Sequence, residues 1–213
     1  MEDRISFLTK TFYFSLYFFL FVSFAFTRSE SIAICIDVRG KVNREGGVRT
    51  GLIRKGDIIY DGDKIMTDKN GFSSIIFHND KTKTNVYDNT SIKIFYVQNP
   101  SGSSYEIALF GGKVIAEMKS QKSLIISAPS TEALATGAHF ILEYRNDLLF
   151  DDSSHSIFTL LTGRLEIKNE ISDQFIYPDA GQTIISTLGG KILQLDTFKN
   201  STIISNSINN FNQ

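Results

Sequence analysis

Turn signals recur throughout residues 40–190 and leave only short stretches of chain between them. This spacing of turns is the feature that most limits the fold of the chain. Asp61-Gly62 and Asn70-Gly71 are hairpin-type dipeptides, because glycine accepts a positive φ without a steric penalty. The stretches between turns are rich in β-branched residues, which favour strands. The chain contains 27 Ile and only 9 Ala, the residue that best favours helix. We therefore expect an all-β fold, either a twisted sandwich or a short solenoid-like stack.

The expected strands are short. They cover residues 32–38, two segments within 57–67, and 72–77, 84–88, 92–97, 105–110, 113–118, 123–127, 140–144, 157–161, 164–168, 175–177, 183–186 and 191–195. The apolar residues of the first strand alternate and are expected to share one face: Ile32, Ile34, Ile36 and Val38. Only residues 131–135 have a composition compatible with a helix, and they span barely one turn. One tripeptide pattern, a glycine followed by a basic and then an aliphatic residue, occurs four times at unequal spacing, so it is not a periodic repeat. We interpret each occurrence as a turn that leads into a strand; the four begin at Gly40, Gly112, Gly163 and Gly190.

The N-terminal segment differs from the rest of the chain. No charge occurs between residues 11 and 27, Arg4 and Lys10 precede that run, and Ser23 and Ala25 suit a cut after Ala25. This layout is typical of a secretory signal peptide. An uncleaved membrane anchor and a buried core helix are the alternatives, and Ile34 is too bulky for a lipoprotein site at Cys35. We expect a signal peptide or anchor over residues 1–25, an all-β domain over 26–199, and a polar, disordered tail over 200–213.

Charge and cysteine content exclude several classes of protein. The net charge of −1 argues against nucleic acid as a partner. The single cysteine, Cys35, excludes an intrachain disulfide and a zinc site made of several thiolates. Export by the N-terminal segment would place the all-β domain in the periplasm or otherwise outside the cytoplasm, with residues 11–27 as a possible membrane tether.

The order of turns and strands resembles the FecR-type periplasmic domain, the family of the ferric-citrate regulator, over roughly residues 36–186. The matching motifs are Gly40-Lys41-Val42, Lys55-Gly56-Asp57, Asp61-Gly62-Asp63-Lys64-Ile65-Met66-Thr67, Ser74-Ile75-Ile76-Phe77, Asn79-Asp80, Asn89-Thr90-Ser91-Ile92-Lys93-Ile94, Gly111-Gly112-Lys113-Val114, Ser127-Ala128-Pro129, Thr136-Gly137-Ala138-His139-Phe140, Gly163-Arg164-Leu165-Glu166 and Ala180-Gly181-Gln182. The sequence departs from the pattern at Lys81, where the family usually has Gly, and at Ala138, where it usually has Thr.

The resemblance implies an extracytoplasmic binding domain whose partner is an outer-membrane transducer or another envelope component. The regulators of this family resemble sigma-factor controllers and carry a cytoplasmic helical segment before one membrane span. Only ten residues precede the apolar run here, so we expect no such segment and no direct control of a sigma factor.

Three aspartates near the first turns could offer oxygen ligands to calcium: Asp57, Asp61 and Asp63. An EF-hand loop that started at Asp61 would place Ile65 at its fifth position, where a ligand is required. Aspartate is also an ordinary turn residue, because its carboxylate accepts backbone N–H groups. We therefore interpret these residues as turn formers.

The histidines show no ligand spacing. His78 and His139 each neighbour a phenylalanine on a strand and are expected to face solvent. Asp152 and His155 could form an acid–base pair, but a polar loop is the expected place for both. The adjacent carboxylates Asp151 and Asp152 would face opposite sides of a strand, which does not suit a glycosidase. The chain has neither a Gly-x-Ser-x-Gly elbow nor a phosphate-binding Gly-x-x-x-x-Gly-Lys motif.

Two surface features could bind polymers. A basic cluster could meet anionic lipid, lipopolysaccharide or cell-wall polymer, unless it is a solvated loop: Arg44, Arg49, Arg54 and Lys55. Three aromatic residues could stack on sugars, although core packing is the more ordinary role: Tyr87, Phe95 and Tyr96. Sequons at Asn89 and Asn200 matter only in a source that glycosylates exported proteins.

These observations predict an exported, non-enzymatic module of the cell envelope that captures a protein partner through an exposed sheet face or edge. The alternative is a module that binds glycan or cell-wall polymer. We assign no catalytic, cofactor-binding or metal-ligating residue, and we expect no cofactor.

Overall fold

The computed structural model describes residues 30–99, 102–119, 121–146 and 154–196. The chain divides into two compact units, Met1–Glu30 and Ser31–Gln213. The predicted signal peptide or anchor and the predicted tail lie outside the described residues. No helix in the described ranges is long and apolar enough to span a membrane.

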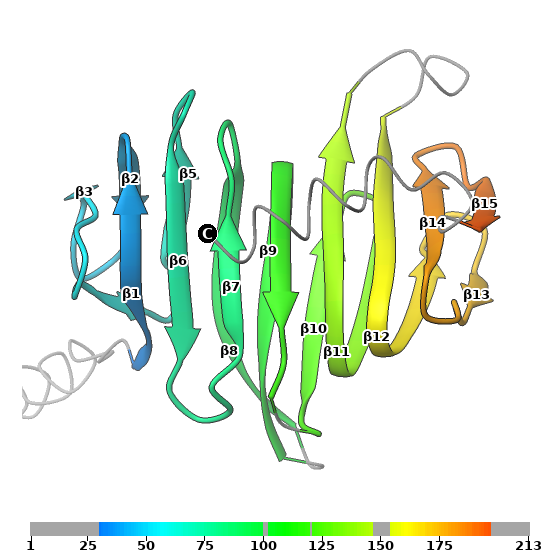
Figure 1. Ribbon diagram of the computed structural model, residues 1–213, viewed down its shortest axis with the longest axis horizontal. Helices are drawn as coiled ribbons and strands as arrows, with labels where there is room; N and C mark the ends of the chain where they lie inside the picture. Colours follow the sequence, from blue (N-terminus) through cyan, green and yellow to red (C-terminus); the bar gives the residue numbers. More distant parts are fainter. Residues whose placement is uncertain (1–29, 100–101, 120, 147–153, 197–213) are drawn as a thin grey trace, which may run out of the picture. The chain divides into compact units, whose positions relative to one another are not determined.

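The second unit is all-β, as the sequence predicts, and its strands join into a single mixed sheet (Figure 1). The strands are β1 (Ser31–Arg39), β2 (Val42–Glu45), β3 (Gly51–Leu52), β4 (Ile58–Tyr60), β5 (Lys64–Thr67), β6 (Phe72–Phe77), β7 (Lys83–Val86), β8 (Ser91–Asn99), β9 (Gly102–Glu117), β10 (Ser123–Ala128), β11 (Thr131–Arg145), β12 (His155–Asn169), β13 (Gln174–Ile176), β14 (Gln182–Thr187) and β15 (Ile192–Asp196). The main path runs β15-β14-β12-β11-β10-β9-β7-β6-β1-β4, and β9 pairs in parallel with β10.

Three long strands change partners along their length, and this folds the sheet over on itself. Up to Gly111, β9 pairs with β8, whereas from Gly112 onward it pairs with β7 and β11. In the same way, β11 pairs with β10 before Gly137 and with β9 after it. The partners of β12 change near Gly163, from β14 to β13. Each long strand therefore contributes one half to each wall of the fold.

The core lies between the two walls. Phe77 of β6 stacks on Tyr105 of β9 with ring centroids 4.4 Å apart, and both side chains are buried. At the other end, the Oγ atoms of Thr131 and Ser186 lie 2.8 Å apart, and Asn169 donates to the same Ser186 Oγ. Thr131, Asn169 and Ser186 are all buried, so these hydrogen bonds satisfy polar groups that water does not reach.

Glycine at the bends is required by geometry. Gly163 has a φ of +88° and Gly112 has the same value. A Cβ atom at Gly163 would overlap the carbonyl oxygen of Gly137 and lie 2.5 Å from Cα of Ala138. These are backbone atoms of the neighbouring strand β11, so they cannot rotate away. At Gly112 a Cβ atom would overlap Oγ1 of Thr90, which accepts a hydrogen bond from the N–H of Lys113, and would also lie 2.6 Å from Cα of Thr90.

Two sequence predictions about these segments are wrong. The expected strand pairs 105–110 with 113–118 and 157–161 with 164–168 are continuous strands, because Gly112 and Gly163 bend the chain without ending it. Gly40 and Gly190 do lie in turns, as predicted. Residues 131–135, compatible with a helix by composition, begin β11, because both β10 and β12 pair with them.

The face of the first strand is also corrected. Ala33 and Cys35 are fully buried, whereas Ile34 and Ile36 are only half-buried. The pairing of β1 with β6 skips Ile36, which marks a β-bulge. A second irregularity, in the pairing with β4, lies between Ser31 and Ala33, where Ile32 and Ala33 are both buried. Extra residues of this kind shift the alternation of faces, so the simple alternation read from the sequence does not hold.

We expect Gly163→Ala to lower the free energy of unfolding by more than about 2 kcal/mol, because it combines an unfavourable φ with a clash against backbone. Gly56→Ala is the matched control, since Gly56 has a φ of +91° but no atom within 4 Å of its Cβ position. It should cost only about 1 kcal/mol. Urea denaturation of both variants measures the difference. Equal losses would show that the bend does not need the close approach at Gly163.

Candidate functional site

The three aspartates considered as calcium ligands each accept a backbone N–H group. Asp57 accepts from Arg54, Asp61 from Tyr96, and Asp63 from Tyr60, at 2.8–2.9 Å. The bonds to Asp57 and Asp63 are local and close turns, as the sequence predicts, whereas Asp61 ties its turn to β8. Within the described ranges, no group of three His, Cys, Asp or Glu side chains is arranged to hold a metal ion.

The histidines are dispersed over the sheet. His78 shares a hydrogen bond of 3.1 Å with Ser31 Oγ and is half-buried. His139 is half-buried too, and desolvation lowers the pKa of its imidazole. The predicted solvent-facing positions of both are thus only partly correct. His155 is fully buried at the start of β12, so its expected place in a polar loop is wrong. Asp151 and Asp152 lie outside the described residues.

The aromatic residues considered for sugar stacking do not form an exposed platform. Tyr87, Phe95 and Tyr96 are all half-buried, and Tyr96 packs against the core. Burial raises the pKa of the Tyr87 hydroxyl, and the edge of its ring meets Phe72. Asn89 is exposed at a turn, whereas Asn200 lies outside the described residues.

The basic cluster contains one residue that behaves unlike a surface cation. Arg44 of β2 is only 4% exposed, and its Nη1 atom donates to the carbonyl oxygen of Ile58 at 2.6 Å. The same Nη1 lies 3.8 Å from Oδ2 of Asp63, which is itself fully buried. The two charges therefore attract each other without a direct hydrogen bond.

Arg44 and Asp63 together close the free edge of β4. This strand pairs only with β1 within the described part of the chain. On its other side, the carbonyl of Ile58 accepts a hydrogen bond from Arg44. The N–H of Tyr60 donates to the carboxylate of Asp63, and the carbonyl of Tyr60 accepts from the N–H of Asp63. A sheet edge with satisfied backbone groups offers little to an incoming strand. The ion pair is thus an edge cap made of side chains.

Burial raises the pKa of Asp63, although the N–H of Tyr60 and the charge of Arg44 oppose that rise. The loop after β2 packs directly onto the carboxylate, since a Cβ atom at Gly46 would overlap Oδ1 of Asp63. Oδ1 of Asp63 and Nε of Arg44 are both buried without a hydrogen-bond partner. The edge cap is therefore desolvated but incompletely satisfied.

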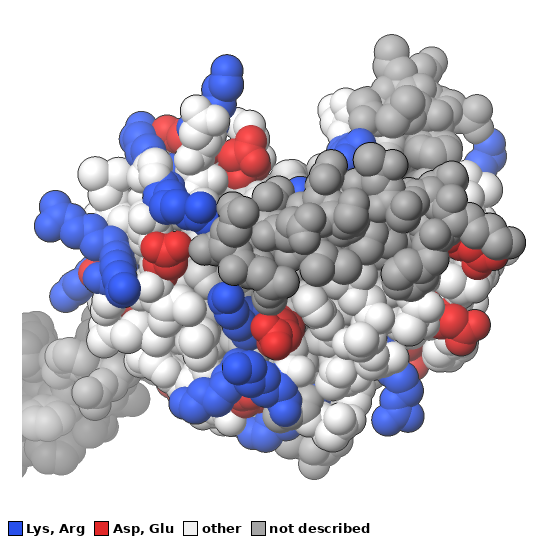
Figure 2. All heavy atoms as spheres, in the orientation of Figure 1, with Lys and Arg blue, Asp and Glu red and all other residues white. Residues whose placement is uncertain are grey.

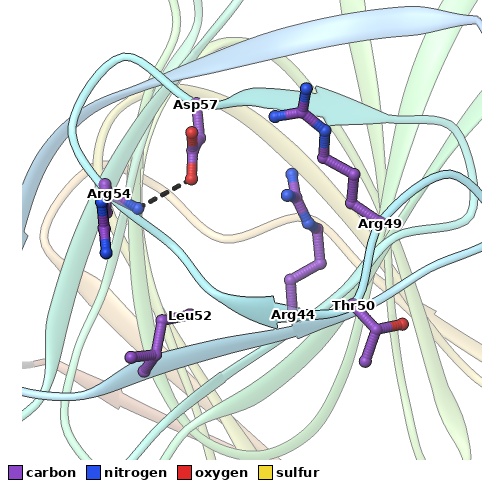
Figure 3. A pocket seen from close by; sticks show the side chains of 6 residues that line it. All are labelled: Arg44, Arg49, Thr50, Leu52, Arg54 and Asp57. Carbon is purple, nitrogen blue, oxygen red and sulfur yellow. Dashed lines mark hydrogen bonds between the residues drawn. The ribbon is translucent and has the colours of Figure 1, made fainter.

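Beside the edge cap is an open pocket of about 410 Å³ (Figure 3). Arg44, Arg49 and Arg54 line it with Thr50, Leu52 and Asp57. The sequence predicted this basic cluster, and the structure brings its three arginines around one cavity. Lys55, the fourth member, does not line it. On the face shown in Figure 2, Lys and Arg side chains are more frequent over the half that contains β1 to β7.

The opposite end of the sheet, around β15, exposes large apolar side chains. Within the described residues, β15 pairs only with β14, in an unbroken register from Ile192 to Asp196. Leu193 and Leu195 are 41% and 50% exposed. Further large apolar side chains are exposed in the neighbouring segments: Ile171, Phe175, Tyr177 and Leu188.

Sequence reasoning assigned no role to this end of the chain. A signal for it exists, because Ile192–Leu195 contains no Lys, Arg or Pro, the residues that usually protect an edge strand. What the sequence did not reveal is that β15 is the outermost strand. That position depends on the pairing of β14 with β12, which leaves β15 with one partner among the described strands.

We expect Arg44→Gln to lower the free energy of unfolding by about 3 kcal/mol, because it leaves Asp63 buried without a counter-charge. Lys41→Gln is the control, since it removes the exposed ion pair with Asp68 and should cost less than about 1 kcal/mol. Chemical denaturation of both variants at neutral pH measures the two values. Similar small losses would contradict a structural role for the edge cap.

No family model matches this sequence, and no curated protein matches it. Solved structures provide a likeness in fold. Two crystal structures, each described as a "putative anti-sigma factor" from Parabacteroides distasonis, match with TM-scores of 0.51 and 0.50 at 15% sequence identity. The matches cover 66% and 65% of this chain, and 64% and 62% of those chains. This chain is thus similar in fold to proteins described as anti-sigma factors, over somewhat less than two thirds of their length.

Proposed function

We propose that the all-β unit is a non-enzymatic, FecR-like binding domain that acts outside the cytoplasm and captures a protein partner at the β15 edge. The observation that carries the proposal is the difference between the two ends of the sheet. Arg44 and Asp63 close the β4 edge, whereas β15 presents an edge strand with two exposed leucines and a single charged residue, Asp196, at its end. The extracytoplasmic location rests on the signal-like layout of residues 1–25. The likeness in fold to described anti-sigma factors supports a regulatory domain of the envelope.

The orientation of the β15 backbone suits the addition of a strand. The N–H of Thr187 donates to the carbonyl of Lys191, at the start of the β14–β15 pairing. Because backbone groups alternate along an antiparallel strand, those of residues 193 and 195 face β14 and those of Ile192 and Gln194 face outward. A partner strand could bond to these outward groups.

The side chains of β15 would contribute specificity. Leu193 lies opposite Ile185, and Leu195 lies opposite Thr183. Both leucines therefore stand on one face of the sheet, while Ile192 packs against the core. A partner strand with apolar residues at alternate positions would cover the leucines while its backbone extends the sheet.

The test distinguishes the contribution of the backbone N–H to partner binding from that of the side chain, at one position of β15. We expect Gln194→Pro to abolish partner capture, because proline has no N–H to donate to a carbonyl of the partner strand. The hydrogen bonds between β15 and β14 remain, since the N–H of residue 194 faces outward. Gln194→Ala, which removes the side chain but keeps the N–H, should retain capture. Photo-crosslinkers at positions 193 and 195, in the native envelope, report contact, and a crosslinker at position 58 on the capped edge serves as the negative control.

Equal crosslinking in the two Gln194 variants, or crosslinks from position 58 alone, would contradict the proposal. Retention of the purified protein on peptidoglycan or polysaccharide resin, with no protein crosslinks from β15, would favour the glycan-binding alternative instead.

A further inference from the structure

We propose that the pocket beside the edge cap is a binding site for a phosphate-type oxyanion, such as inorganic phosphate or a phosphate monoester. The site lies around β2, β3 and the loops that flank β3, away from β15. The inference is therefore independent of the proposed capture of a partner strand.

The pocket carries an excess of positive charge that its own residues do not neutralise. The buried carboxylate of Asp63 offsets the charge of Arg44. Three guanidinium groups and one carboxylate line the pocket itself, so one positive charge remains in excess. Oδ2 of that carboxylate, Asp57, accepts the backbone N–H of Arg54 at 2.9 Å. Within the described residues, neither Arg49 nor Arg54 takes part in an ion pair. An anion would supply the missing charge.

Arg44 gives the site a fixed component. Its guanidinium is held by the Ile58 carbonyl and is almost fully buried, so it has little rotamer freedom to lose on binding. Its donors are not all used, since Nε has no acceptor and Asp63 lies too far from Nη1 for a hydrogen bond. A buried cation is costly, and an oxyanion in the pocket would lower that cost through charge attraction.

The flanking side chains can adapt to the ligand. In Figure 3, the guanidinium groups of Arg44 and Arg49 extend toward the same part of the pocket, Arg44 from β2 and Arg49 from the loop before β3. Thr50 donates to the carbonyl of Gly46 at 3.5 Å, a weak bond that leaves its hydroxyl available. Guanidinium groups bind phosphate oxygens in pairs, and several such groups match a tetrahedral oxyanion better than a neutral ligand.

The test titrates the full-length protein with inorganic phosphate at constant ionic strength, set with sodium chloride, and follows backbone amide shifts by NMR. Saturable shifts are expected in residues 44–57. Arg49→Gln and Arg54→Gln should each weaken binding about tenfold, the loss expected for one charge-assisted hydrogen bond. Both residues are exposed, so the variants should fold normally. Arg164→Gln, at an exposed arginine of β12, is the matched control and should leave binding unchanged.

A second arm distinguishes the source of the phosphate group. Vesicles that contain phosphatidic acid present it on a lipid surface, and phosphatidylcholine vesicles are the blank. Binding of inorganic phosphate alone would indicate a soluble ligand, whereas binding of both would indicate that a lipid headgroup can enter. The proposal is overturned if neither binds, or if Arg164→Gln weakens binding as much as the pocket variants do. Crosslinking at β15 should be the same in all these variants, so this test and the test of partner capture can fail separately.

Discussion

The fold depends on three strands that bend without ending. Because β9, β11 and β12 each pair with one set of neighbours before a glycine and another set after it, a single hydrogen-bonded sheet provides both walls of the core. The bends of β11 and β12 lie against each other, so the backbone of Gly137 occupies the space that a side chain at Gly163 would need. The packing of Phe77 on Tyr105 follows from this arrangement, since it joins the two walls that the bends bring together.

A sheet that folds over in this way still has two ends, and here the ends differ. At β4 the outward backbone groups bond to Arg44 and Asp63, and both side chains are buried. At β15 the strand is in unbroken register, its two leucines are exposed, and its single charged residue, Asp196, stands at its end. The charged end carries the arginine pocket, and the apolar end carries the exposed leucines. The two proposed modes of recognition therefore concern opposite ends of one domain.

The sequence predicted the fold class because turn dipeptides and β-branched residues are local signals. It could not distinguish a glycine that ends a strand from one that bends it, since Gly163 and Gly190 have nearly the same φ and differ only in their neighbours. The bulge at Ile36 was hidden for a related reason, because the skipped pairing is visible only opposite β6. His155 was misplaced because it follows a polar stretch in the sequence, yet the start of β12 buries it.

The candidate sites were predicted unevenly for the same reason. The arginines near β3 were recognisable as a basic cluster, but burial separates Arg44 from the others, and burial is set by the tertiary fold.

The continuity of the bent strands also affects how the domain would respond to force. Strain applied along β15 would pass into β14 and β12, and β12 runs through both walls. Separating the two walls would require the bends of all three continuous strands to open, so the walls should come apart together and not one strand at a time.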